Sequence, residues 1–225
     1  MKVACCWSGG KDSCLACWKA IAGGHDVRFL INFVSTGTGR DSFHGVTREL
    51  LGMHSEASGI PMIQRETTWE GYEATFREVM RELQQEGIEG LVAGDMALEE
   101  HRQWMENMCG EFGLEPILPL WGLDPADVVD EFIAEGFKSV VVCVKGEFLG
   151  EEWLGREIDR GFKTELENPG REPVVDVCGE NGEFHTFVFD GPLFSERLSL
   201  VRGGKHWKDG YGFLELSRAS LTGKV

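Results

Sequence analysis

The segment VACCWSGGKDS, from Val3 to Ser13, is the part of the sequence that best indicates the class of fold. A short apolar run ends at Trp7, a Ser-Gly-Gly turn follows, and an amphipathic segment runs from Asp12 to Ala22. This order predicts a strand, a loop and a helix. Such a loop directs backbone N–H groups and the positive end of the helix dipole at one point, which makes it a natural anion site.

Each residue type in this loop suits phosphate binding. The glycines let the backbone approach a ligand closely, the serines and Lys11 add donors and one positive charge, and Asp12 is placed to hold a Mg²⁺ ion that bridges phosphate oxygens. The pattern is neither GxxxxGK[ST] nor GxGxxG. The predicted nucleotide-binding residues are Ser8, Gly9, Gly10, Lys11, Asp12 and Ser13.

The chain up to residue 145 alternates between strand and helix patterns. The expected strands are Val3–Trp7, Val27–Val34, Met62–Gln64, Gly90–Asp95, Glu115–Leu118 and Lys138–Lys145. The helices expected between them include Gly45–Ala57 and a helix from Asp124 to about Glu135. Strands separated by helices of about 10–15 residues predict an α/β fold, a parallel sheet with helices on both faces.

The pattern changes after Gly150. Trp153 to Arg156 looks helical, Phe184 to Phe189 reads as a strand, and Arg197–Arg202 and Gly210–Leu216 are expected to form a hairpin. We therefore expect a nucleotide-binding domain over residues 1–125 and a smaller α+β, substrate-facing part over residues 126–225, with the boundary between 125 and 150.

Composition narrows the classes of partner. The 225 residues include 22 basic and 38 acidic side chains, a net charge of −16, so phosphate backbones are repelled and a nucleic-acid partner is not expected. No run approaches the roughly 18 apolar residues of a membrane helix, and the short N-terminal run is not a secretory signal. Seven cysteines, several within apolar runs, predict reduced thiols and a cytoplasmic protein.

A second group of polar residues lies between Asp176 and Phe194. It contains Glu180, Asn181, Glu183, His185 and Thr186. On a strand, residues two apart share a face, so Glu183 and His185 are expected to project together. A carboxylate beside an imidazole raises its basicity, which suits proton removal near neutral pH. The alternative is an ordinary turn and edge strand with a surface Glu–His pair.

The loop Ser8 to Ser13, directly after an apolar N-terminal strand, resembles the PP-loop of the adenine nucleotide α-hydrolase superfamily, the N-type ATP pyrophosphatases. Members of that superfamily cleave ATP to AMP and pyrophosphate. The resemblance implies a doubly wound, Rossmann-like sheet, adenylylation of a substrate oxygen, and an adenine held near the end of the second strand, around Asn32 to Ser35.

Further landmarks resemble the diphthine ammonia ligase family, in the same order along the chain. They are Gly94-Asp95 before a helix with Arg102 and Glu106-Asn107, then Pro119–Gly122, Trp153–Asp159 and the segment Asp176–Phe194. The similarity covers residues 2 to 194. In that family, ATP converts the carboxylate of diphthine, a modified histidine of elongation factor 2, into an acyl-adenylate, and ammonia displaces AMP to leave an amide.

The resemblance assigns roles to residues of this chain. Lys11 and a Mg²⁺ ion on Asp12 are implied to stabilise the departing pyrophosphate, with Glu183 and His185 as further catalytic candidates. Asn32 and Gly94 are implied to join the nucleotide site. The acceptor site is implied to contain Gly179, Glu180, Asn181, Gly182, Glu183 and Thr186. ATP, ammonia and elongation factor 2 are the implied partners, and a homodimer is a further expectation.

Two departures from the family pattern bear on the substrate. Diphthine-specific members read GEGGEYET or GEGGEFET where this chain has Asn181 and His185, and DSYMYHT where it has Asp41 to Thr47. A paralogue acting on another acid is therefore one alternative. A tRNA-thiolating PP-loop enzyme using Cys14 and Cys17 is a second, although core packing also explains these cysteines. A non-catalytic ATP sensor is a third.

Overall fold

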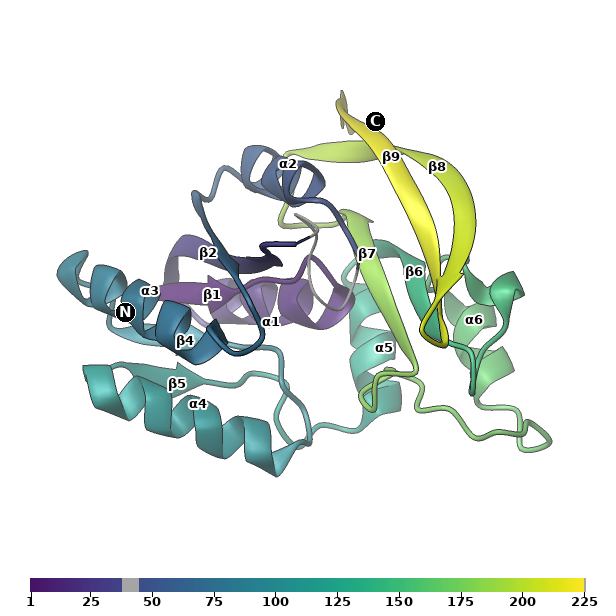
Figure 1. The fold of residues 1–225 in the computed structure, drawn as a ribbon, viewed down its shortest axis with the longest axis horizontal. Helices are drawn as coiled ribbons and strands as arrows, with labels where there is room; N and C mark the ends of the chain where they lie inside the picture. The colour runs from purple at the N-terminus through teal and green to yellow at the C-terminus, as the bar shows by residue number, and fades with distance from the viewer. Residues whose placement is uncertain (38–44, 225) are drawn as a thin grey trace.

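The computed structural model describes residues 1–37 and 45–224 (Figure 1). The elements are β1 (Lys2–Cys6), α1 (Lys11–Ala22), β2 (Asp26–Ser35), α2 (Arg48–Ser58), β3 (Met62–Thr67), α3 (Tyr72–Gln85), β4 (Gly90–Val92), α4 (Glu99–Phe112), β5 (Glu115–Ile117), α5 (Pro125–Ala134), β6 (Lys138–Lys145), the 3₁₀ turn η1 (Glu151–Trp153), α6 (Arg160–Leu166), β7 (Phe184–Asp190), β8 (Glu196–Lys208) and β9 (Tyr211–Gly223).

The first sheet is parallel and doubly wound. Its strand order is β3-β2-β1-β4-β5, and every neighbouring pair is parallel. The chain moves outward from β1 to β3 and then returns to the other side of β1, so the order reverses between β1 and β4. Ala4 and Ile31 pack against α3 and α4, whereas Cys5 and Leu30 pack with α1 and α2. The expected α/β fold with helices on both faces is confirmed.

The second sheet is antiparallel, in the order β7-β6-β9-β8. The expectation that Lys138–Lys145 continues the parallel sheet is therefore wrong. The strand has the expected bounds as β6, but it pairs with β7 and β9. All positions from Ser139 to Val144 are buried, because β6 is a central strand covered on both faces. A strand buried on both faces has the same apolar sequence in either kind of sheet.

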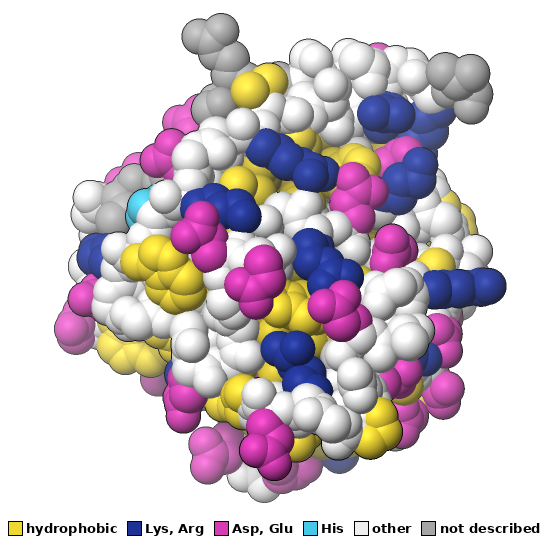
Figure 2. All heavy atoms as spheres, turned by 90° about the vertical axis from the view of Figure 1, so that its right-hand side faces the viewer, with side chains coloured by type: hydrophobic (Ala, Val, Ile, Leu, Met, Phe, Trp, Pro, Cys, Tyr) yellow, Lys and Arg dark blue, Asp and Glu magenta, His cyan; other side chains and the backbone are white. Residues whose placement is uncertain are grey.

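The expected hairpin near the C-terminus is confirmed and is longer than its sequence pattern indicated. Strands β8 and β9 have 13 residues each, with Lys208 opposite Tyr211. The turn residues Asp209 and Gly210 have φ values of 51° and 83°, as a two-residue turn between twisted strands requires. Figure 2 shows the side of the molecule that carries this hairpin, where basic, acidic and apolar side chains are interspersed.

Capping residues set where several helices begin. Thr47 caps α2 by accepting a hydrogen bond from the Leu50 N–H at 3.3 Å, so α2 begins at Arg48 rather than at Gly45. Asp124 caps α5 as expected, with Pro125 in the first helical position. The helical pattern around Trp153 is only one 3₁₀ turn, η1.

The two sheets share a core. One cluster of buried side chains contains Cys5 and Leu15 from the first half together with Val141 and Phe187 from the second.

The division of the chain into a nucleotide-binding domain and a substrate-facing part at residue 125 stays a prediction. Among the helices of the described residues, none is long and apolar enough to cross a membrane.

Candidate active site

The phosphate loop joins β1 to α1, and its backbone depends on glycine. Gly9 has a φ of +77°, and a Cβ at this position would lie 2.7 Å from Leu51 Cδ2. Gly10 is extended and occupies the N-cap position of α1 without a side-chain cap. The N-terminus of α1 is therefore presented at the loop with no cap from the loop itself, which suits an anion.

Two serine hydroxyls close this loop around Gly10. The Oγ atoms of Ser8 and Ser13 lie 3.2 Å apart. Ser8 Oγ accepts from the Gly10 N–H at 3.2 Å, and Ser13 Oγ donates to the Gly10 carbonyl at 3.1 Å. The structure thus brings together the residues that the sequence assigned to the loop.

Lys11 is buried, with 4% of its surface exposed. Its ammonium donates to Asp12 Oδ2 at 2.9 Å and to the Cys178 carbonyl, and it lies 5.4 Å from the centre of the Phe184 ring. Burial alone would lower the pKa of Lys11, but the negative charge of Asp12 and other neighbours raises it overall. Lys11 therefore keeps its positive charge, next to Cys178 and Phe184 of the second half of the chain.

Asp12 offers one carboxylate oxygen beyond its ion pair with Lys11. Oδ1 is buried and has no hydrogen-bond partner within residues 1–37 and 45–224. The same residues contain no group of three or more His, Cys, Asp or Glu that could hold a metal ion. This arrangement fits Mg²⁺, which is often held by one or two carboxylates together with substrate phosphates and water.

Strand β7 lies directly over the phosphate loop. Thr186 Oγ1 accepts from the Lys11 backbone N–H at 3.0 Å, and the Val188 N–H donates to the Gly9 carbonyl at 2.9 Å. Residues 175 positions apart are thereby joined at the first turn of α1. The C-terminal motif and the phosphate loop form one site.

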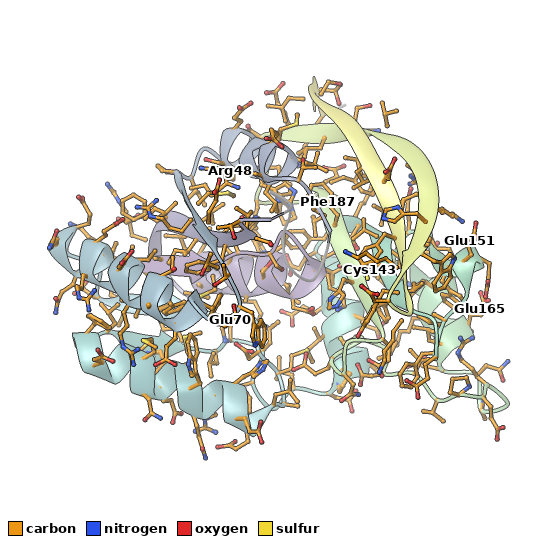
Figure 3. The ribbon with its side chains drawn as sticks, in the orientation of Figure 1. Arg48, Glu70, Cys143, Glu151, Glu165 and Phe187 are labelled. Carbon is orange, nitrogen blue, oxygen red and sulfur yellow. The ribbon has the colours of Figure 1, made fainter. Side chains whose placement is uncertain are left out.

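His54 of α2 forms a third connection at the loop. Trp7 Nε1 donates to His54 Nδ1 at 3.1 Å, and His54 Nε2 lies 2.7 Å from the Val188 carbonyl. Because an indole N–H only donates, Nδ1 is the acceptor and Nε2 carries the proton. Burial lowers the pKa of His54 to about 4, so the ring is neutral. The ring also stacks on Phe187, which Figure 3 labels on β7, with centroids 4.5 Å apart.

The turn from Asp176 to Glu183 is held by Glu183 itself. One carboxylate oxygen accepts from the Asp176 N–H at 3.0 Å, and the other accepts from the Asn181 N–H at 3.0 Å. Strand β7 begins at Phe184, so Glu183 precedes it and its buried side chain folds back into the turn. The expectation that Glu183 projects beside His185 from one strand face is therefore not met, because the turn's own N–H groups bind the carboxylate.

Glu180 connects this turn to the loop after β4. Its Oε1 accepts from the N–H groups of Met96 and Ala97 at 3.2 and 3.3 Å. Burial raises the pKa of Glu180, and the charge of Asp12 acts in the same direction. In the same loop, a Cβ on Gly94 would lie 2.8 Å from the Asp12 carbonyl carbon. The close approach between this loop and the start of α1 explains the glycine.

The other glycines of the turn have positive φ values, 68° at Gly179 and 79° at Gly182. A Cβ on Gly179 would lie 2.9 Å from the Phe184 carbonyl oxygen, whereas one on Gly182 would meet nothing within 4 Å. Asn181 is exposed at the tip of the turn. Asn181 is thus exposed to solvent, while the buried Glu183 carboxylate binds the backbone N–H groups of the turn.

His185 lies on the opposite face of β7 from the phosphate-loop contacts. Phe184 and Thr186 both approach Lys11, so alternation places the residue between them on the other face. There it is paired with Cys143 of β6, labelled in Figure 3. The structure brings Thr186 to the phosphate loop and places His185 on the other face of β7.

The loop expected to bind the acceptor lies partly outside the described residues, which omit 41–44. Of the remainder, a Cβ on Gly45 would lie 3.0 Å from Phe213 Cδ1, and Phe213 is opposite Cys143. Since Cys143 is also opposite His185, Gly45 and His185 lie on one face of the second sheet.

Asn32 and the cysteines have packing roles in the structure. Asn32 lies within β2, and its buried Nδ2 donates to the Trp7 carbonyl at 2.9 Å, just before the phosphate loop. Cys14 and Cys17 are fully buried on α1, as the core-packing explanation requires. Burial also raises the pKa of the Cys14 thiol, so neither redox nor sulfur chemistry is favoured there.

Comparisons with known proteins identify the family of this chain. The family models described as the diphthamide synthase N-terminal domain and the diphthamide synthase C-terminal domain match residues 1–116 and 124–222. The chain belongs to the diphthamide synthase family. A mouse protein named diphthine–ammonia ligase is 29% identical, with 100% of this chain and 94% of that protein covered. The human protein of the same name is 29% identical, over 88% and 82%.

Membership of the diphthamide synthase family confirms the expected family and the expectation of an enzyme of the ligase class.

A solved structure described as a predicted subunit of tRNA methyltransferase from Methanocaldococcus jannaschii has a TM-score of 0.44 and 17% identity. It covers 63% of this chain and 80% of its own. The fold itself rests on the strand order.

The sequence patterns did not identify His54 as a neighbour of the phosphate loop, nor the pairing of Asp95 with His101. His54 falls on the apolar face of α2, four residues after Leu50 and three before Ala57. A histidine on the apolar face of a helix is a buried polar residue, and this spacing is the pattern that could have identified it. Asp95 ends the expected fourth strand, and His101 follows it six residues later, a pairing that only the structure makes visible.

Proposed function

We propose that the chain is an ATP-dependent amide ligase. It adenylylates a carboxylate with release of pyrophosphate and then couples the acyl group to ammonia with release of AMP. The names of the relatives supply diphthine as the carboxylate, and the family resemblance implies that this diphthine lies on elongation factor 2. The observation that carries this proposal is the contact of Thr186 with the Lys11 N–H, which joins the acceptor motif to the phosphate loop.

The loop binds the triphosphate of ATP through the N-terminus of α1, the Ser8 and Ser13 hydroxyls and Lys11. Asp12 Oδ1 would hold a Mg²⁺ ion, which would supply positive charge to neutralise the phosphate oxygens. Lys11, with its raised pKa, stays positive and stabilises the negative charge on the departing pyrophosphate. Asn32 supports the loop from β2, and Gly94 from the loop after β4.

The acceptor carboxylate approaches from the side of the turn Asp176–Glu183. Glu183 keeps the turn in shape, and Glu180 holds it to the loop after β4. Asn181 lies on this turn and is proposed to contact the acceptor, whereas His185 lies on the face of β7 away from the phosphate loop; both residues depart from the diphthine-specific pattern. A different carboxylate is therefore the second candidate, with the same ATP chemistry.

The seven free thiols suit a reducing compartment such as the cytoplasm.

The test is to incubate the purified protein with Mg-ATP, ammonium and elongation factor 2, either diphthine-bearing or unmodified. AMP, pyrophosphate and a diphthine-dependent amide support the full proposal. AMP without a change on the factor keeps the ATP chemistry and rejects diphthine. ADP, or no turnover with any carboxylate tried, contradicts the proposal and favours a sensor.

A further inference from the structure

A histidine–aspartate pair lies beside the phosphate loop and has no role in the chemistry described so far. His101, in the first turn of α4, has its Nδ1 atom 3.3 Å from Asp95 Oδ1. The His101 side chain is 64% exposed and that of Asp95 is 24% exposed. The neighbouring residue, Arg102, forms a hydrogen bond with Glu106 and lies over the Trp121 ring. Its side chain is therefore engaged away from the pair of His101 and Asp95.

The position of this pair follows from the sheet order. The order reverses between β1 and β4, and ligands of open α/β sheets bind outside the carboxyl ends of the strands at such a point. The loop after β1 is the phosphate loop, and the loop after β4 carries Asp95. Because β1 and β4 are parallel neighbours, these two loops lie side by side at the carboxyl edge of the first sheet.

Contacts on both sides of Asp95 support this placement. The preceding residue, Gly94, lies against the backbone of Asp12, and the following residues, Met96 and Ala97, donate to Glu180 of the acceptor turn. Asp95 therefore lies on the segment between the phosphate loop and the acceptor motif. Loss of solvation and then the charge of Asp95 raise the pKa of the Cys6 thiol at the end of β1, which agrees with that position.

The pair has the arrangement of a general base. An ionised carboxylate only accepts, so Nδ1 of a neutral His101 carries the proton toward Asp95, and Nε2 keeps its lone pair. An imidazole held in this tautomer can accept a proton at Nε2. The exposure of His101 lets the bound proton pass to solvent.

We propose that His101, oriented by Asp95, is the catalytic base that accepts a proton from the attacking nitrogen. This inference rests on the proposed ligase function. The nitrogen lone pair forms the bond to the acyl carbon, one N–H proton passes to His101 Nε2, and the acyl–oxygen bond breaks with its electrons leaving on AMP. The products are the amide, AMP and one proton, which His101 returns to solvent.

The experiment separates the two half-reactions in the purified protein, with diphthine-bearing elongation factor 2 as the acceptor. ATP–pyrophosphate exchange reports adenylylation and needs no nitrogen. For His101→Gln we expect exchange within about twofold of wild type and ammonia-dependent amide formation reduced about 100-fold. Equal losses in both reactions, or no loss of amide formation, would overturn the assignment.

Two further measurements distinguish a base from a structural residue. Added imidazole should restore part of the amide formation of His101→Ala, and the absence of rescue contradicts a base at this position. The control His25→Gln removes a half-buried histidine from the turn between α1 and β2, at the edge of the first sheet away from the phosphate loop, and both half-reactions should be unchanged.

A measurement without substrate keeps the inference testable if elongation factor 2 is not the acceptor. Absence of exchange in the wild-type protein would reject diphthine as the acceptor, not His101 as the base. Nitrogen NMR of the imidazoles should then show the Nδ1–H tautomer for His101 in the wild type and its loss in Asp95→Asn. An Nε2–H tautomer in the wild type overturns the proposal.

Discussion

The backbone N–H of Lys11 donates to the side-chain oxygen of Thr186 at 3.0 Å, across 175 residues of sequence. Lys11 is the first residue of α1, and Thr186 is the third of β7. The N–H group belongs to the anion-binding end of the helix, and the hydroxyl belongs to the motif proposed to bind the acceptor. One hydrogen bond therefore couples the position of the phosphate loop to the second half of the chain.

Removing this hydroxyl should destabilise the protein and reduce ATP use. Thr186→Val has nearly the same volume but leaves the buried Lys11 N–H without an acceptor, so we expect a loss of about 1–3 kcal/mol in the free energy of unfolding. Urea unfolding measures it. Thr186→Ser keeps the hydroxyl and should retain most of the stability. If the valine and serine variants are equally stable, the hydrogen bond is not important.

The conformation of Gly9 should not tolerate a side chain. Its φ of +77° and the Leu51 contact at 2.7 Å predict that Gly9→Ala loses more than about 1 kcal/mol of stability and most pyrophosphate release. Gly52→Ala is the matched control, because Gly52 lies inside α2 and a Cβ there would meet no atom within 4 Å, so this variant should gain about 0.5–1 kcal/mol. A harmless Gly9→Ala substitution would contradict the loop geometry.

His54 should make stability fall in mild acid. Its pKa is about 4 in the folded protein and 6.5 ordinarily, so the unfolded chain binds the proton first as the pH falls. The contribution of neutral His54 is complete above about pH 6.5 and is lost toward pH 4, a decrease of about 3 kcal/mol. Urea unfolding between these pH values should show a shallower dependence in His54→Gln. Equal slopes for the two proteins would rule out His54 as the source.

The buried thiols should resist alkylation in the folded protein. Burial raises the pKa of Cys14 well above its ordinary value and raises the pKa of Cys143 to about 12. Since the thiolate is the reactive form, iodoacetamide at neutral pH should leave both unmodified until urea unfolds the chain. Mass spectrometry of the peptides reads the result. Rapid modification of Cys14 in the native protein would revive the sulfur-transfer alternative.

Local patterns were sufficient where a single segment determines its own structure. The order strand, Ser-Gly-Gly turn and helix identified the phosphate loop, and Asp124-Pro125 identified the start of α5. The hairpin was expected from Arg197–Arg202 and Gly210–Leu216, whereas its turn is Asp209-Gly210 and its strands extend beyond those ranges.

Features that depend on tertiary partners could not be obtained in this way. The apolar run of β6 does not state which strands it pairs with, because β6 is covered on both faces. The role of Glu183 depends on where β7 begins, and one residue decides whether its side chain projects with His185 or folds into the turn. The contacts of His54 join residues that are distant in sequence.

The central claim is that the Ser8–Ser13 loop drives cleavage of ATP to AMP and pyrophosphate for amide formation. Its most direct test is pyrophosphate release with Mg-ATP, ammonium and diphthine-bearing elongation factor 2, comparing wild type with Lys11→Met, which keeps the buried stem but removes the charge. We expect AMP and pyrophosphate in equal amounts with the wild type, and neither with Lys11→Met. Pyrophosphate release by Lys11→Met at the wild-type rate, or ADP as the product of the wild type, would contradict it.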